Sequence, residues 1–135
     1  SLESALSDAM AAVPDCLGVA CVDAGSGTVR AVQVTEPLSA DSLATVALAT
    51  AALFRQEADA LVAGHFAPDA GTDAATGDQP WGRDMLVYSD GLIHVLMRMK
   101  KNPDHVVAFA CRMSANIGMV LNKARMAVEQ VAEQV

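Results

Sequence analysis

The chain has 135 residues, of which 53% are hydrophobic and only 4% aromatic, and its formal net charge is −7 at pH 7. This length fits one domain whose core is built from aliphatic side chains. The negative charge argues against nucleic acid or an anionic membrane as a partner, because phosphate groups would repel it.

The first part of the chain predicts a helix followed by a β-hairpin. Apolar residues recur at helical spacing over residues 2–13, and Pro14 ends that helix. Two runs rich in β-branched and apolar residues, 16–23 and 28–34, are separated by a short glycine-rich turn. This arrangement is typical of two antiparallel strands.

The turn itself, within "CVDAGSGT" at residues 21–28, resembles a phosphate-binding loop. Such loops lie between a strand and a helix, so that the helix N-terminus faces the anion. Here a second strand follows, and the loop contains no lysine. The pattern is also similar to one loop of the actin and sugar-kinase superfamily, which requires two lobes and a much longer chain. We therefore predict a turn without a nucleotide.

A long helix is predicted over residues 40–63. Ser39 is a suitable N-cap, and Leu38 can pack on Leu43 as a hydrophobic staple. The apolar stripe of this helix is wider than packing on one sheet requires, and its many alanines would let another helix approach closely. The excess favours a partner helix from a second copy of the chain, although alanine is also simply a good helix former.

The last part of the chain predicts three strands and a helix. The runs 84–89 and 92–99 flank Asp90-Gly91, a strong signal for a tight hairpin. A third strand is expected over 105–111, and Ser114 can cap a final helix. The spacing of apolar residues predicts that its buried face consists of Ile117, Val120, Leu121, Ala124, Val128, Val131 and Val135.

The element order α-β-β-α-β-β-β-α indicates an α+β fold. Both faces of strand 92–99 are partly apolar, so we expect helices on both sides of a mostly antiparallel sheet, as a three-layer sandwich. Residues 67–83 have turn and linker composition, which predicts a flexible surface loop within a single domain spanning 1–135. No apolar run approaches the length of a membrane span and no signal pattern is present, so we expect a cytoplasmic protein.

Residues with catalytic or metal-binding chemistry are sparse. Three cysteines occur without C-x-x-C spacing, which favours buried free thiols over a metal site. His94 and Cys111 would lie opposite each other if the 92–99/105–111 hairpin paired symmetrically, but a one-residue slip would put them on opposite faces. Arg55 could act on a partner's phosphate, although pairing with Asp59 one turn later is the simpler interpretation. We expect no cofactor and no metal.

With this element order, the chain resembles the Roadblock/LC7 superfamily, which includes bacterial MglB-type proteins. The segment "ALSDAMAAVPDCLGVACVDAGSGTV" is similar to the opening helix and first hairpin of that family, and "SLATVALATAALFRQEADAL" to its alanine-rich central helix. The segment "MLVYSDGLIHVLMRM" and the following "HVVAFACRMSANIGMVLNKAR" resemble its three-strand meander and the start of its last helix. The motif at that helix start consists of Asn116, Gly118, Val120 and Arg125.

The resemblance implies a strand order of 2-1-5-4-3, with the central helix on one face and the terminal helices on the other. It also implies a homodimer in which the 84–89 edge strands pair and the central helices lie side by side. Such dimers are non-enzymatic platforms that bind and regulate small Ras-like GTPases or scaffold signalling complexes. The residues expected at the dimer interface are Val46, Thr50, Leu53, Phe54, Glu57, Met85, Val87 and Ser89.

Two alternatives come from other functional classes. A small-ligand sensor of PAS- or profilin-like shape would require an internal cavity. A thiol enzyme using Cys111 or Cys21 would require a reactive thiolate. The leading hypothesis remains a homodimeric adaptor that docks a small GTPase.

Overall fold

The computed structural model describes residues 1–64, 84–89 and 91–135, with the side chains of 56–64 left out. The predicted loop 67–83 therefore lies outside the described residues. The helices are α1 (Leu2–Ala12), α2 (Ala40–Gly64) and α3 (Ile117–Ala132). The strands are β1 (Cys16–Asp23), β2 (Thr28–Val34), β3 (Asp84–Ser89), β4 (Leu92–Arg98) and β5 (His105–Arg112).

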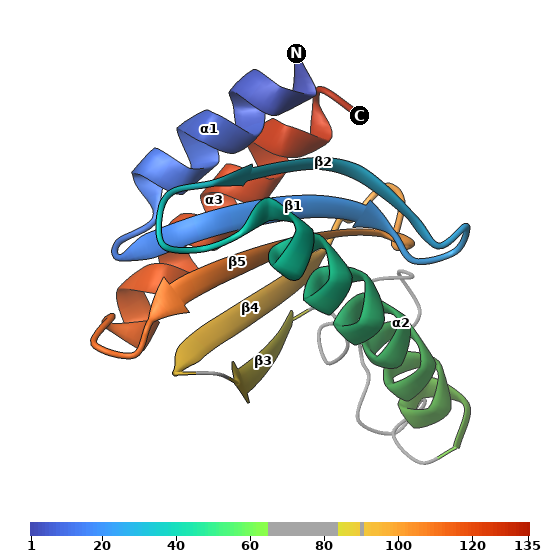
Figure 1. The fold of residues 1–135 in the computed structure, drawn as a ribbon. Coiled ribbons are helices and arrows are strands. Elements are labelled where there is room, and N and C mark those ends of the chain that lie inside the picture. Colours follow the sequence, from blue (N-terminus) through green and yellow to red (C-terminus); the bar gives the residue numbers. More distant parts are fainter. Residues whose placement is uncertain (65–83, 90) are drawn as a thin grey trace.

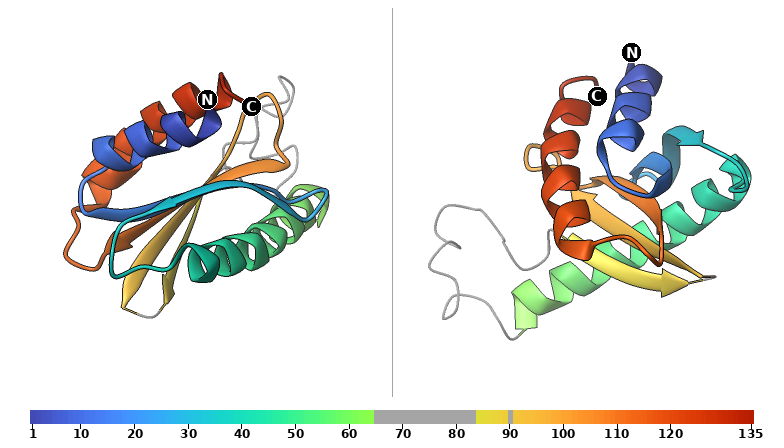
Figure 2. Two further views of the ribbon diagram at one scale, coloured as in Figure 1. Left: turned by 45° about the horizontal axis from the view of Figure 1, so that its top comes forward. Right: turned by 90° about the vertical axis from the view of Figure 1, so that its left-hand side faces the viewer.

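The strands form one antiparallel sheet of order β2-β1-β5-β4-β3, as expected. Helices α1 and α3 cover one face and α2 covers the other (Figures 1 and 2). The central strands β1 and β5 are buried along almost their whole length because helices cover them on both sides. The predicted α+β three-layer fold is confirmed.

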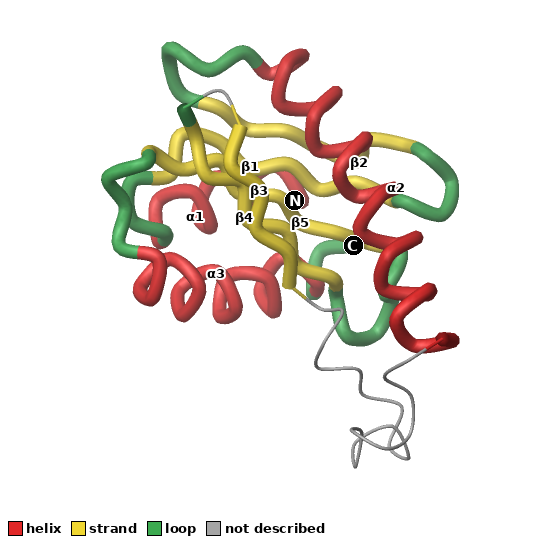
Figure 3. The backbone as a smooth tube through the Cα atoms, turned by 90° about the horizontal axis from the view of Figure 1, so that it is seen from below, coloured by secondary structure: helices red, strands yellow, loops and turns green. Residues whose placement is uncertain are grey.

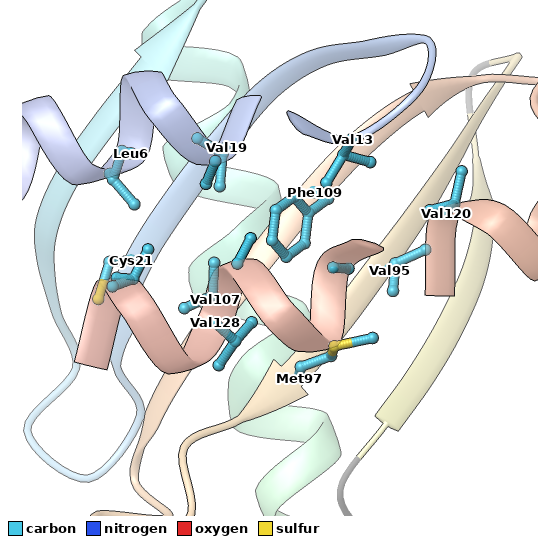
Figure 4. Packing of buried hydrophobic residues seen from close by; sticks show 14 of the residues in the cluster. Leu6, Val13, Val19, Cys21, Val95, Met97, Val107, Phe109, Val120 and Val128 are labelled. Carbon is cyan, nitrogen blue, oxygen red and sulfur yellow. The ribbon is translucent and has the colours of Figure 1, made fainter. Parts of the chain in front are cut away.

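Each face of the sheet has its own hydrophobic core. The upper core lies between the sheet and helices α1 and α3, and Phe109 stands near its centre (Figure 4). The lower core lies between the sheet and α2, where Ala20, Val22 and Ala108 share one cluster with Leu43 and other residues of α2. Small residues on the lower side of the strands let α2 approach the sheet closely. Close approach also requires small residues on the helix, so part of the alanine content of α2 serves packing within the chain.

The start of α2 is built as predicted. The Ser39 hydroxyl accepts a hydrogen bond from the Ser42 backbone N–H at 3.3 Å. Leu38 and Leu43 meet over Gly18, where a Cβ atom would lie 2.9 and 2.8 Å from their side chains. Glycine at this position of β1 therefore makes room for the staple.

The start of α3 differs from the prediction. Asn116, not Ser114, is the N-cap, and its side chain accepts a hydrogen bond from the Met119 backbone N–H at 3.1 Å. The residues before it form a turn in which the Ala115 backbone N–H bonds to the Arg112 carbonyl. Ser114 is used inside this turn, so the helix begins later.

The buried face of α3 follows the predicted spacing for most of the helix. Its fully or nearly buried members are Val120, Ala124, Ala127, Val128 and Val131. Val135 is 39% exposed, because α3 has already ended and helical spacing no longer applies there.

Candidate protein-interaction surface

The glycine-rich loop between β1 and β2 is a turn held by its own aspartate. The Asp23 carboxylate accepts hydrogen bonds from the backbone N–H groups of Gly25, at 2.9 Å, and Ser26, at 3.1 Å. Gly27 has a φ of 73° and closes the turn through its N–H to the Asp23 carbonyl. N–H groups that could cradle a phosphate are thus already occupied by an anion, which supports the prediction of a turn.

This arrangement predicts a measurable pH effect. Hydrogen bonds from Ser26 and then Gly25, with His105 nearby, hold the pKa of the Asp23 carboxyl below its ordinary value of 3.8. A lowered pKa in the folded state means that the stabilisation is fully present above the ordinary value and is lost as the pH falls through the lowered one. In Asp23→Asn the amide oxygen can still accept both hydrogen bonds, but it does not titrate.

We therefore expect the unfolding free energy of Asp23→Asn to fall less than that of the wild type as the pH drops below about 4. Urea unfolding at a series of acidic pH values measures this difference. Parallel curves for the two proteins would show that Asp23 is not stabilised as an anion.

The paired strands keep the thiol of Cys111 away from His94. In the β4–β5 register Cys111 is opposite Ile93, and His94 is opposite Ala110. Cys111 packs in the upper core, whereas Ala110 packs in the lower core, so the imidazole and the thiol lie on opposite faces. The one-residue slip is the arrangement found, and the thiol–imidazole pair does not form.

Arg55 is held by the loop before β5. Its Nε atom lies 2.7 Å from the Asp104 carboxylate, and the Asp104 carbonyl accepts from the Ala24 backbone N–H at 2.8 Å. The pair ties α2 to the β1–β2 side of the sheet. The side chain of Asp59, the partner predicted from sequence, lies outside the described residues.

The ion pair of Arg55 shows which flank of α2 faces which strands of the sheet. Leu48 and Arg55 lie on the same flank, which faces the β1–β2 side. At 100° per residue, Val46, Thr50 and Leu53 lie on the opposite flank, toward β4 and β3. Helix α2 packs closely over β1, β2 and β5, and leaves the β3 side of this face less covered (Figure 3).

The two edge strands of the sheet differ in how they are protected. Strand β2 carries an irregular register opposite β1 and the charged Arg30, both of which hinder pairing with another strand. Strand β3 pairs regularly with β4 and contains neither proline nor lysine. Its one charged residue, Asp84, bonds to Arg125 at 3.0 Å. The β3 edge is thus suited to pairing with a further strand.

The fold of this chain is similar to that of several proteins of known structure. No protein-family model matches the sequence, and no curated protein sequence matches it. A Roadblock/LC7 domain from Streptomyces avermitilis is similar in structure, with a TM-score of 0.70, 16% identity, and coverage of 98% of this chain and 95% of that chain. The gliding protein MglB of Thermus thermophilus has a TM-score of 0.63 and 15% identity, covering 99% and 90%. Myxococcus xanthus MglB has a TM-score of 0.65 and 11% identity, covering 98% and 93%.

The chain has the Roadblock/LC7 fold. The strand order and helix placement that the resemblance implied are both present. Within the described residues, no helix is long and apolar enough to cross a membrane.

Most of the expected interface residues border one region of the Roadblock/LC7 fold, the lower sheet face between α2 and β3. We call this region the α2–β3 surface; its members are Val46, Thr50, Leu53, Met85, Val87 and Ser89. Leu53 is 49% exposed, and the other members are half-buried. Phe54 is 3% exposed and belongs to the lower core, where its ring lies under Arg98. The side chain of Glu57 lies outside the described residues.

Two surface features on the other side of the Roadblock/LC7 fold were not predicted from the sequence. Met113, Met119 and Met126 are each more than half exposed, and the spacing of the last two on α3 was the available signal. A pocket of about 600 Å³ lies between the end of β4 and the second half of α3. Its rim carries exposed charged residues such as Lys101 and Glu133, unlike the internal cavity that a small-ligand sensor would require.

Proposed function

We propose that the protein is a non-enzymatic homodimeric adaptor that docks and regulates a small Ras-like GTPase. The observation that carries the dimer is the β3 edge, to which none of the described strands other than β4 pairs, beside the exposed flank of α2. Pairing of β3 with its symmetry copy would satisfy the free edge of each sheet. It would also bring the apolar flanks of the two α2 helices side by side on the lower face of the joined sheet.

The α2–β3 surface is chemically suited to this contact. Its side chains are apolar or small, and the Thr50 hydroxyl is turned back onto the helix, bonding to the Val46 carbonyl at 2.7 Å. Dimerisation there would leave the opposite face, with α1 and α3, open for a partner. One similar structure, with a TM-score of 0.64 and 15% identity, is an MglB with a tetrameric arrangement, which supports self-association of this fold.

The GTPase part of the proposal is supported by the shared fold with MglB and MglC structures. The adaptor would act by binding one nucleotide state of the GTPase more tightly, since only differential affinity shifts a conformational equilibrium. The net charge of −7 favours a partner with a basic docking face.

Affinity capture with tagged protein, in lysate lots supplied with GDP or a non-hydrolysable GTP analogue, identifies the GTPase by mass spectrometry. We then expect the purified GTPase to bind at least about 10-fold more tightly in one nucleotide state, a coupling of about 1.4 kcal/mol. Titration calorimetry with both loaded forms measures this ratio. Equal affinities would exclude regulation by this mechanism, and the absence of any GTPase from both lots would exclude the partner while leaving the dimer intact.

A further inference from the structure

Two of the three cysteines are neighbours across β1 and β5. Cys16 begins β1 and is the register partner of Cys111. One position before β1 begins, the Arg112 backbone N–H donates to the Asp15 carbonyl at 3.0 Å. Asp15 and Arg112 are therefore a hydrogen-bonded pair. The next pair, Cys16 with Cys111, is then a non-hydrogen-bonded pair, and the register shifts by one residue directly after it. In regular pairs of this kind the Cα atoms are about 4.5 Å apart. This separation lies within the range that a disulfide spans.

The two thiols already interact on the same face of the sheet. Cys111 is fully buried in the upper core, and Cys16 packs against that core from its edge. As register partners on this face, the two residues lie directly across from each other, and the Cys16 thiol donates a hydrogen bond to the Gly18 carbonyl at 3.2 Å. Oxidation therefore requires little movement of either strand.

The two thiols differ in exposure and in pKa, so they should differ in their reactivity toward an oxidant. Cys16 is partly exposed, at the turn that follows α1, whereas Cys111 is fully buried. The hydrogen bond from Cys111, helped by backbone groups of Gly18 and Ala110, lowers the pKa of Cys16 despite its burial. The same bond and burial raise the pKa of Cys111. A thiolate is the reactive form, so an oxidant should meet Cys16 first.

We propose that Cys16 and Cys111 are a peroxide-sensitive dithiol, in which Cys16 is oxidised first and Cys111 resolves it into an intramolecular disulfide. The Cys16 thiolate attacks one oxygen of hydrogen peroxide, the O–O bond breaks, and hydroxide leaves, giving a sulfenic acid. The Cys111 sulfur then attacks the Cys16 sulfur, the S–O bond breaks, and water leaves with the Cys111 proton. In total two thiols and one peroxide give one disulfide and two waters.

Cys21 provides a matched control within the same strand. It is fully buried in the upper core, and burial raises its pKa to about 11. Its register partners are Ala31 and Val107, so no second thiol lies opposite it. Cys21 should stay reduced under conditions that oxidise the Cys16–Cys111 pair.

The pair lies on the upper face, away from the α2–β3 surface. The disulfide would form within one chain whether or not the protein dimerises. Because the bond closes most of the chain into one loop, we expect the oxidised protein to melt about 5 °C or more above the reduced protein. Dithiothreitol should return the melting temperature to its starting value.

The experiment treats reduced, folded protein with hydrogen peroxide and maps the products by mass spectrometry without reduction. Trypsin leaves Cys16 and Cys21 on one peptide, so the assignment is made in Cys21→Ala protein. It is repeated on the wild type with chymotrypsin, which can cut after Leu17. We expect a cross-link between the Cys16 and Cys111 peptides, and a single-chain band on a non-reducing gel.

Variants test the order of the two steps. In Cys111→Ala we expect dimedone to trap a sulfenic acid at Cys16. In Cys16→Ser we expect Cys111 to react with peroxide at least about 10-fold more slowly than Cys16 does in Cys111→Ala. The proposal is overturned if wild-type protein forms no internal cross-link, if the cross-link joins two chains, or if Cys21 reacts as fast as Cys16.

Discussion

The Leu53→Glu variant should be a monomer at micromolar concentrations at which the wild type is a dimer. Leu53 is the most exposed apolar residue of the α2–β3 surface, at 49%. Fully burying a leucine side chain stabilises by about 1.5–3 kcal/mol. Leu53 is already half covered, so the contact adds about half of this in each protomer, and a two-fold axis counts the residue twice. Glutamate removes both contributions and places like charges near the axis, so we expect the dimer dissociation constant to rise at least about 100-fold. Sedimentation equilibrium over a concentration series measures this constant.

Met119→Glu is the matched control for the helix. Met119 is 51% exposed and also lies on a helix, but α3 covers the opposite face of the sheet. The same introduced charge there should leave the dissociation constant unchanged. If both variants weaken association equally, the effect comes from net charge and not from the α2–β3 surface.

A second pair of variants separates the two sheet edges. Val87→Lys places a charge on β3, and Val29→Lys places one on β2, where Val29 is 39% exposed. Only the β3 variant should weaken the dimer, because lysine on an edge strand opposes strand pairing. If the dimer persisted with Val87→Lys and dissociated with Val29→Lys, the interface would lie at the β2 edge and the proposal would be wrong.

The Phe109→Ala variant should lose about 3–5 kcal/mol of unfolding free energy, the usual cost of emptying a fully buried aromatic site. Phe109 is 0% exposed and stands between Val19 and Val95 in the register of the central strands. Helices cover it from above, so the sheet cannot collapse into the space without moving α1 or α3. Urea unfolding, followed by circular dichroism, measures the loss.

The measurement is best made in the Leu53→Glu background, since association would otherwise add a concentration-dependent contribution to stability. Val29→Ala, on the exposed part of β2, is the comparison and should change the unfolding free energy by less than about 0.5 kcal/mol. A loss below about 1 kcal/mol for Phe109→Ala would mean that the upper core repacks freely, contrary to the close packing around this ring.

Local chemistry made most of the secondary structure predictable. Ser39 caps α2 because a hydroxyl at that position can reach a backbone N–H three residues on. Asp23 and the glycines after it form a turn because their hydrogen bonds involve only neighbouring residues. The bounds of β1, β2 and β3 agree with the sequence for the same reason. The prediction of Ser114 as the N-cap of α3 was wrong because Asn116, two residues later, is an equally good cap.

The sequence by itself determined the order of the elements, the turn at Asp23 and the apolar excess on α2, because each depends on residues close together in the chain. Only the tertiary structure decided which distant residues meet. The β4–β5 register separates His94 from Cys111, and the β1–β5 pairing instead brings Cys16 to it. A strand has a side-chain period of two, so a shift of one residue exchanges the two faces, and sequence patterns that are apolar on both faces do not choose between them.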